Sequence, residues 1–191
     1  MITRTLLLTG SLLAAPMALA GWTLDSGSSI SFTSTINNDQ LQQHHFREFD
    51  GLVTDKGAAT INIRLASVTT DTAGLDEQLR KHLFEVNRFP TAVLQMSIPK
   101  TALEQIRNGQ SVPFKASGAL AFHGKRVPVK ASLIASPAAD NSILVTNDSP
   151  LMLNTDAFSL TSAINHLREL AGLDSITSDV PVSLNLVFKP E

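Results

Sequence analysis

Histidine is the residue type in this sequence best able to carry acid–base chemistry or to bind a metal ion, and the chain has five. His44 and His45 are adjacent, so on a strand they point to opposite faces. His82, His123 and His166 are far apart in sequence, and none of the five has the spacing of a zinc motif. We therefore expect solvated or hydrogen-bonded histidines and no metal site. A metal-assisted enzyme built on His44, His45 or His123 remains an alternative.

Side chains that act as nucleophiles or as acid–base pairs show no catalytic pattern either. The chain has no cysteine, which excludes thiol catalysis and cysteine-bound metals. It also lacks the Gly-x-Ser-x-Gly elbow of hydrolases and any glycine-rich phosphate loop. Two neighbouring carboxylates, Asp76 and Glu77, fall on the polar side of an amphipathic segment, where charges are normally solvated. We predict no catalytic residue, no cofactor and a non-enzymatic function.

The first twenty residues have the pattern of a cleavable signal peptide. Arg4 precedes the apolar run Leu6–Leu13, and Ala18–Ala20 has small residues at the two positions that a signal peptidase reads. The run is too short and too interrupted for a membrane span, which needs about 20 apolar residues. No cysteine follows to carry a lipid anchor. We expect residues 1–20 to be removed and residues 21–191 to form one soluble periplasmic domain.

The expected mature chain is mildly acidic, with 14 basic and 17 acidic side chains and a net charge of −3 once Arg4 is removed. Nucleic acids and anionic membrane surfaces attract basic patches, so neither is an expected partner. Without cysteine, the fold depends on its core and has no disulfides.

Alternation of apolar and polar residues predicts a chain that is mostly β-structure. The alternating segments are 29–33, 61–66, 92–98, 112–123, 127–133, 143–145 and 180–188. Short amphipathic helices are expected at 75–86, at 101–109, where Thr101 to Glu104 resembles a capping box, and at 164–172. Many strands with one apolar face each predict an antiparallel sandwich or barrel.

Five segments in a fixed order carry a resemblance to a known family. They are Trp22–Asp25 with Ser29, Ile30 and Phe32; the turn Phe46–Gly51; Ser67–Thr70; Leu79–Pro90; and the hairpin Gly118–Gly124. With these spacings, the sequence resembles the YceI-like family of secreted bacterial lipid-binding proteins over nearly all of residues 21–191.

The resemblance implies an all-β fold: an eight-stranded antiparallel, lipocalin-like barrel, here with two or three short helices. It also implies an elongated apolar cavity that sequesters or carries a polyisoprenoid or another long apolar lipid. The sequence departs from the family at Ser28, where histidine is frequent, and at Thr69, where aspartate is frequent. We expect these departures to affect the polar end of the ligand more than the barrel.

Strand alternation predicts which residues line the cavity, because the apolar face of each strand points into a closed barrel. One continuous tunnel is expected, lined by Phe32, Leu65, Leu94, Met96, Phe114, Gly118, Leu120 and Phe122. The loop residues Phe46, Phe49, Phe84 and Phe89 are expected at its mouth, with Phe84 and Phe89 equally suited to plug a filled core. Leucine at Gly118 should then block the tunnel in a protein that still folds.

Alternatives to the lipid-binding hypothesis remain at this point. One is a barrel with a filled core that acts in an interaction or stress response; the other is the metal-assisted enzyme. A lipid site without titratable groups predicts binding that is insensitive to chelators, to pH and to alanine at His44 and His45. No stable membrane insertion is expected, and a homodimer is compatible with the sequence.

Overall fold

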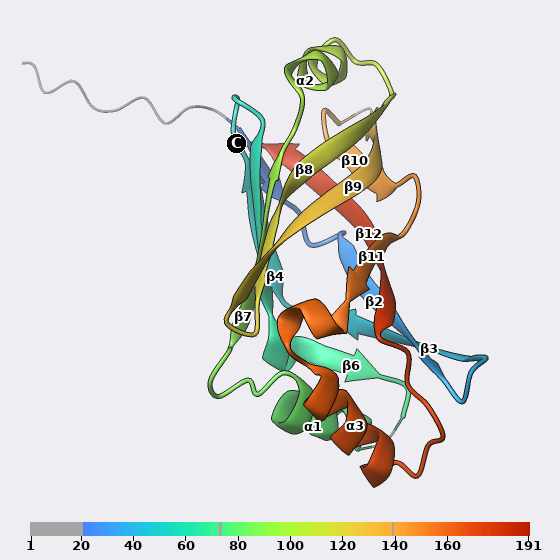
Figure 1. Ribbon diagram of the computed structural model, residues 1–191. Helices are drawn as coiled ribbons and strands as arrows, with labels where there is room; N and C mark the ends of the chain where they lie inside the picture. Colours follow the sequence, from blue (N-terminus) through green and yellow to red (C-terminus); the bar gives the residue numbers. More distant parts are fainter. Residues whose placement is uncertain (1–20, 73, 139) are drawn as a thin grey trace, which may run out of the picture.

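The computed structural model describes residues 21–72, 74–138 and 140–191 (Figure 1). The expected signal peptide, residues 1–20, lies outside the described residues. The strand segments are β1 (Trp22–Leu24), β2 (Ser29–Ile36), β3 (Gln40–Phe46), β4 (Phe49–Val53), β5 (Ala58–Arg64), β6 (Val68–Thr70), β7 (Thr91–Ser97), β8 (Val112–Phe122), β9 (Lys125–Pro137), β10 (Ile143–Asn147), β11 (Leu151–Asn154) and β12 (Asp179–Pro190).

These twelve segments of the described chain make eight long strands, because four of the strands are interrupted. The interrupted strands are β1 with β2, β3 with β4, β5 with β6, and β10 with β11. Neighbours pair antiparallel around the sheet, and β1 pairs with β12 to close the ring. The prediction of a closed, eight-stranded antiparallel barrel is therefore confirmed.

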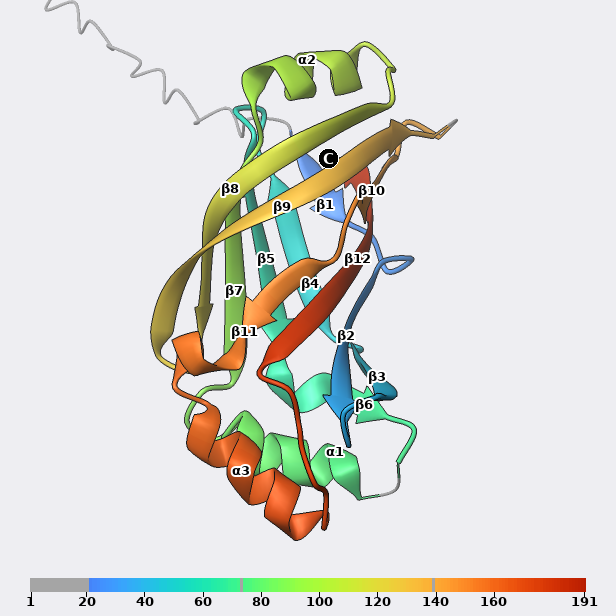
Figure 2. The same ribbon diagram turned by 45° about the vertical axis from the view of Figure 1, so that its right-hand side comes forward.

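Short helices cover both ends of the barrel (Figure 2). The helical elements are η1 (Leu65–Ser67), α1 (Leu75–Gln78), the π-helical turn η2 (Leu79–Leu83), α2 (Lys100–Arg107), η3 (Thr155–Phe158) and α3 (Thr161–Leu170). Helix α2 lies across one end, and α1, η2 and α3 lie together at the other. The three expected helical segments are thus present, although the first continues from α1 into η2.

The start of α2 differs from the expectation. Pro99 is the N-cap residue, no side chain caps the helix, and Thr101 lies inside the first turn. The predicted capping box is therefore wrong, because the chain enters the helix immediately after the proline. The expected stop is correct: Gly109 adopts φ +76°, a left-handed conformation that suits glycine at a helix C-terminus.

Candidate ligand-binding cavity

The larger of two described cavities lies at the α3 end of the barrel and is called here the α3 cavity. Its volume is about 130 Å³, close to that of the apolar cavity of about 150 Å³ that stays dry and binds benzene in another protein. It is lined by Ile30, Ser31, Phe32, Ser34, Phe46, Ile61, Ile63, Leu65, Leu83, Phe84, Ala92, Leu94, Leu120, Phe122, Leu151, Leu153, Thr155, Phe158, Leu160, Ile164, Ile176, Thr177, Val180, Val182 and Leu184. None of these side chains is charged.

Phenylalanines from five parts of the chain form a connected cluster in the wall of the α3 cavity. The Phe84 ring lies 6.2 Å from Phe32, 5.8 Å from Phe46 and 5.9 Å from Phe122, measured between ring centroids. The ring of Phe122 also lies 5.3 Å from that of Phe158. Aromatic rings at these separations pack favourably, so the cluster gives this cavity a stiff, apolar wall.

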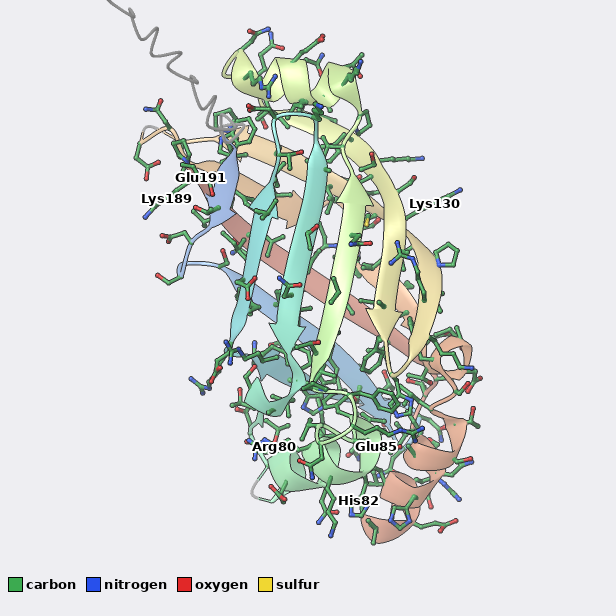
Figure 3. The ribbon with its side chains drawn as sticks, turned by 90° about the vertical axis from the view of Figure 1, so that its left-hand side faces the viewer. Arg80, His82, Glu85, Lys130, Lys189 and Glu191 are labelled. Atoms are coloured by element: carbon green, nitrogen blue, oxygen red, sulfur yellow. The ribbon has the colours of Figure 1, made fainter. Side chains whose placement is uncertain are left out.

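An arginine attaches the helical turn η2, which lines one end of the α3 cavity, to the barrel. Arg80 on η2 donates hydrogen bonds to the carbonyl oxygens of Ala66 (2.8 Å) and Val68 (3.2 Å), which belong to η1 and β6. Arg80 lies at the lower end of the barrel beside α1 (Figure 3). These bonds hold η2 against the barrel and so position Leu83 and Phe84 in the cavity wall.

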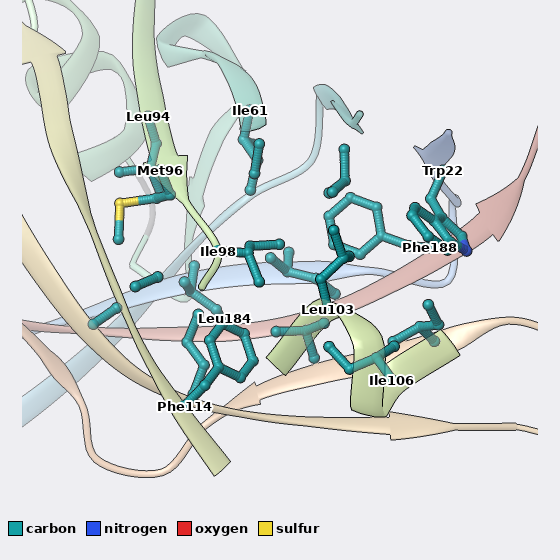
Figure 4. A pocket seen from close by; sticks show the side chains of 18 residues that line it. Trp22, Ile61, Leu94, Met96, Ile98, Leu103, Ile106, Phe114, Leu184 and Phe188 are labelled. Atoms are coloured by element: carbon teal, nitrogen blue, oxygen red, sulfur yellow. The ribbon is translucent and has the colours of Figure 1, made fainter. Parts of the chain in front are cut away.

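A smaller cavity of about 60 Å³ lies toward α2 and is called here the α2 cavity (Figure 4). Leu103 and Ile106 of α2 close it, and Trp22 of β1 lies in its wall. The remaining lining residues are Val53, Ala59, Ile61, Leu94, Met96, Ile98, Phe114, Ala116, Ala131, Leu133, Ile143, Val145, Leu184, Leu186 and Phe188. Every residue in this lining is apolar.

The two cavities adjoin. Ile61, Leu94 and Leu184 belong to the linings of both, so these three side chains stand where one cavity gives way to the other. The interior expected as one continuous tunnel is therefore two apolar cavities in series, along an axis that runs from α2 to α3.

A family model described as YceI-like domain matches residues 22–188. The chain belongs to the YceI-like family. Its sequence resemblance to that family is therefore confirmed. Among functionally curated proteins, none matches this chain significantly.

Solved structures of bacterial proteins share the barrel. A polyisoprenoid-binding domain from Saccharophagus degradans, implicated in plant cell wall breakdown, is 27% identical, with a TM-score of 0.84 over 90% of this chain and 99% of that chain. Burkholderia cenocepacia BcnA is 17% identical, with a TM-score of 0.68 over 86% and 98% of the two chains. The YceI protein of Campylobacter jejuni is 17% identical, with a TM-score of 0.53 over 78% and 84%. The last two likenesses concern the fold alone.

Most of the expected tunnel residues of this YceI-like chain lie in a cavity wall. Phe32, Leu65, Leu120 and Phe122 line the α3 cavity, Met96 and Phe114 line the α2 cavity, and Leu94 lines both. Of the four phenylalanines expected at the mouth, Phe46 and Phe84 line the α3 cavity, and Phe84 is only 4% exposed.

Phe49 and Phe89 line neither cavity, contrary to the expectation for the mouth. Phe49 lies in β4 and packs against the edge of the core. Phe89 packs against His123, with ring centroids 4.4 Å apart, and the guanidinium of Arg88 lies over its ring at 4.9 Å. Its partners thus hold Phe89 beside the β8–β9 turn, away from the two cavities.

Gly118 also lines neither cavity, which corrects the most specific sequence expectation. A Cβ atom at this position would lie 1.8 Å from the carbonyl oxygen of Gln95 and 2.8 Å from Cα of Met96, both on β7. The missing side chain therefore allows β8 to approach the backbone of β7 and leaves no space for a ligand. Gly118→Leu does not test the tunnel, because leucine would collide with β7.

Several lining residues were missed because they belong to helical segments. Leu83 comes from η2, Phe158 from η3 and Ile164 from α3. The period of an amphipathic helix marks Ile164 as buried but does not say which end of a barrel the helix covers. Trp22 had a weak signal, since it opens the first of the segments that carry the family resemblance.

The two departures from the family pattern lie outside both linings. The Ser28 hydroxyl accepts a hydrogen bond from the amide of Val187 (2.9 Å) and so bridges the interruption between β1 and β2. Thr69 donates a hydrogen bond of 3.4 Å to the carbonyl oxygen of His45 in the neighbouring strand. Both side chains connect strands, so the expected effect on the ligand's polar end does not follow from their positions.

The histidines are dispersed. The rings of His82 and His166 lie 4.9 Å apart, between centroids, at the helical end of the barrel, and His123 faces Glu85, with Nε2 and Oε1 3.3 Å apart. Within the described residues, no group of three or more His, Asp or Glu side chains is arranged to hold a metal ion. In the same residues, no helix is long and apolar enough to cross a membrane.

His44 is the one buried histidine of the described chain, at 2% exposure. Its Nε2 atom is hydrogen-bonded to the hydroxyl of Ser34 (3.1 Å), which lines the α3 cavity, and its Nδ1 atom has no hydrogen-bond partner. Burial, reinforced by the neighbouring His45, lowers the pKa of His44 below its ordinary value of 6.5. The site therefore holds a neutral imidazole behind Ser34.

This burial predicts a dependence of stability on pH. Between the folded and the unfolded pKa of His44, the unfolded chain binds more protons, so stability rises with pH. The contribution of His44 is fully present above about pH 6.5 and is lost as the pH falls toward the lowered pKa. The free energy of unfolding in urea should be measured for the wild type and for His44→Gln from pH 7.5 to pH 5. The wild type should lose more stability over this range, and parallel pH profiles of the two proteins would contradict the prediction.

Proposed function

We propose that this protein binds one apolar lipid, of the isoprenoid type or similar, inside the barrel. The observation that carries the proposal is the pair of adjoining cavities, whose linings contain no charged side chain. Membership of the YceI-like family and the likeness to a polyisoprenoid-binding domain support the same ligand class.

The polar groups of the lining indicate where the head of the lipid lies. The α2 cavity has no polar side chain, whereas Ser31, Ser34, Thr155 and Thr177 line the α3 cavity. The hydroxyl of Thr155 is buried without a hydrogen-bond partner. We infer that the head is uncharged, such as an alcohol, phenol, quinone or amide, because burying a charge without a partner costs several kcal/mol.

Burial of a hydrocarbon tail supplies the affinity. Each buried CH₂ group contributes about 0.8 kcal/mol, so one isoprene unit contributes roughly 3 to 4 kcal/mol before ordering costs. A few units in the cavities are thus sufficient for useful binding without an ion pair.

The location and class of the protein are part of the proposal. The pattern of residues 1–20 supports export to the periplasm, where a barrel would sequester or carry a lipid between membranes. We propose a carrier or scavenger and not an enzyme. Ser34 and His44 are hydrogen-bonded beside the α3 cavity, but no side chain accepts a hydrogen bond from Nδ1 to orient the imidazole as in a catalytic triad, and no group of described residues is arranged to hold a metal ion.

Organic extraction of the exported protein, followed by mass spectrometry, tests the proposal. The expected result is a stoichiometric, uncharged lipid with a long hydrocarbon chain, from a protein whose N-terminus is Gly21. Protein that carries no lipid and binds none when purified prenyl alcohols are added would support the filled-core alternative. Stoichiometric bound metal, lost together with an activity on adding a chelator, would support the enzyme.

A further inference from the structure

We propose that Ile61, Leu94 and Leu184 form a constriction that selects ligands by the length of their tail. The inference rests on the proposed lipid-binding function and deepens it. The three residues are the ones shared by the α2 and α3 cavities, so a tail that extends from one cavity into the other must pass between them.

The three side chains come from opposite walls of the barrel. Ile61 on β5 and Leu94 on β7 are direct partners in the antiparallel register, which places them side by side. Leu184 belongs to β12, which is separated from β5 by β1 and β4 in the closed sheet. Figure 4 shows Leu184 facing the ends of Ile61 and Leu94 across the interior. All three are buried, with exposures of 4 to 7%, so their side chains belong to the interior of the barrel.

Hydrogen bonding fixes the backbone at this level. β10 and β11 break opposite Leu184, so the strand ladder offers no acceptor for the Leu184 amide there. The side-chain oxygen of Asn147 accepts a hydrogen bond from this amide and replaces the missing partner. Because the backbone positions are held, the constriction can widen only by side-chain rotation of Ile61, Leu94 and Leu184.

The two cavities differ in a way that orients the ligand. The α3 cavity is about twice as large, at about 130 Å³ against 60 Å³, and has the polar side chains of the lining. The α2 cavity is wholly apolar and closed by α2. A lipid therefore places its head and first units in the α3 cavity. Only a long tail crosses the constriction and reaches the α2 cavity.

The fluorescence of Trp22 can report when a lipid tail passes the constriction and enters the α2 cavity. Trp22 is the single tryptophan of the sequence, and it lines the α2 cavity but not the α3 cavity. A tail confined to the α3 cavity should bind without changing tryptophan emission. A tail that crosses the constriction should displace water or side chains at Trp22 and shift the emission.

The experiment titrates the protein with linear prenyl alcohols of two to nine isoprene units. Calorimetry measures binding, and Trp22 fluorescence measures arrival in the α2 cavity. For the wild type we expect short alcohols to bind without a fluorescence change and longer ones to produce it beyond a threshold length. Leu94→Ala should lower that threshold, whereas Leu184→Phe should weaken the long alcohols at least about tenfold more than it weakens the short ones.

The control is Leu160→Ala, which removes the same atoms from the wall of the α3 cavity at the start of α3, away from the constriction. It should weaken alcohols of every length alike and leave the threshold where it is. Length profiles for Leu94→Ala and Leu184→Phe that match the wild type would overturn the constriction while leaving the lipid-binding function intact. Absence of calorimetric binding at every length would instead overturn the proposed function, and the constriction with it.

Discussion

Replacing Ala92 with phenylalanine is expected to lower the affinity for an apolar ligand at least about 100-fold in a protein that still folds. Ala92 is 5% exposed, lies on β7 and lines the α3 cavity. A phenyl ring at this position would occupy the space that the first part of the lipid tail needs. A 100-fold loss corresponds to about 2.7 kcal/mol, less than the burial of one isoprene unit contributes. Stability should change little, because the ring enters an empty volume of about 130 Å³ and need not displace packed atoms.

The measurement is binding of a prenyl alcohol by calorimetry, together with urea unfolding of each protein. Ala58→Phe serves as the matched control. Ala58 is exposed on the neighbouring strand β5, so this substitution adds the same ring on the outside of the barrel. The control should bind as the wild type does. If Ala92→Phe binds normally while remaining folded, the α3 cavity is not the lipid site.

Replacing Gly118 with alanine is expected to lower the free energy of unfolding by about 3 kcal/mol. A methyl group at this position would lie 1.8 Å from the carbonyl oxygen of Gln95, a backbone atom that no rotamer change can move away. Relief of this collision requires β7 and β8 to separate, although their register is continuous from Val93–Ala121 to Ser97–Ser117. The loss of stability therefore comes from distortion of the sheet between β7 and β8 and not from a change in the ligand site.

Urea unfolding measures this cost, with Gly27→Ala as the matched control. Gly27 lies in the exposed turn between β1 and β2, where the nearest atom to an added Cβ is Asp25 Oδ1 at 3.2 Å, the end of a side chain. The same substitution should thus change stability by much less. Equal effects of the two replacements would show that the close approach of β7 and β8 does not constrain Gly118.

Local alternation predicted seven of the twelve strand segments of the described chain and most of their inward faces. It did not predict β1, β3, β4, β6 or β11. The expected segment 112–123 corresponds to β8, Val112–Phe122, and inward residues such as Leu94 and Leu120 line a cavity as expected. This works because side-chain direction along a strand has a period of two, a local property that the residue order displays. The apolar face of a barrel strand is its inner face, so the list of residues and the family resemblance pointed to an apolar site.

Packing between distant segments could not be predicted in the same way. Gly118 illustrates this, because its role depends on the distance between β7 and β8, and sequence alternation carries no information about that distance. Phe89 looked equivalent to Phe84 as a loop aromatic, yet Phe84 lines the cavity whereas Phe89 packs on His123 outside it. The difference comes from the fold of η2 and the turn after it.

By itself, the sequence thus determined the strand periodicity, the family and the apolar nature of the interior. Only the tertiary structure decided that the interior divides at Ile61, Leu94 and Leu184, that His44 is buried behind Ser34, and that Trp22 lines the α2 cavity. The physical reason is that each of these features combines residues from different strands or helices, which are distant in the sequence. Closure of the barrel through the β1–β12 pair, and the register of each ladder, bring these residues next to their partners from other strands, and no local pattern of residues records that register.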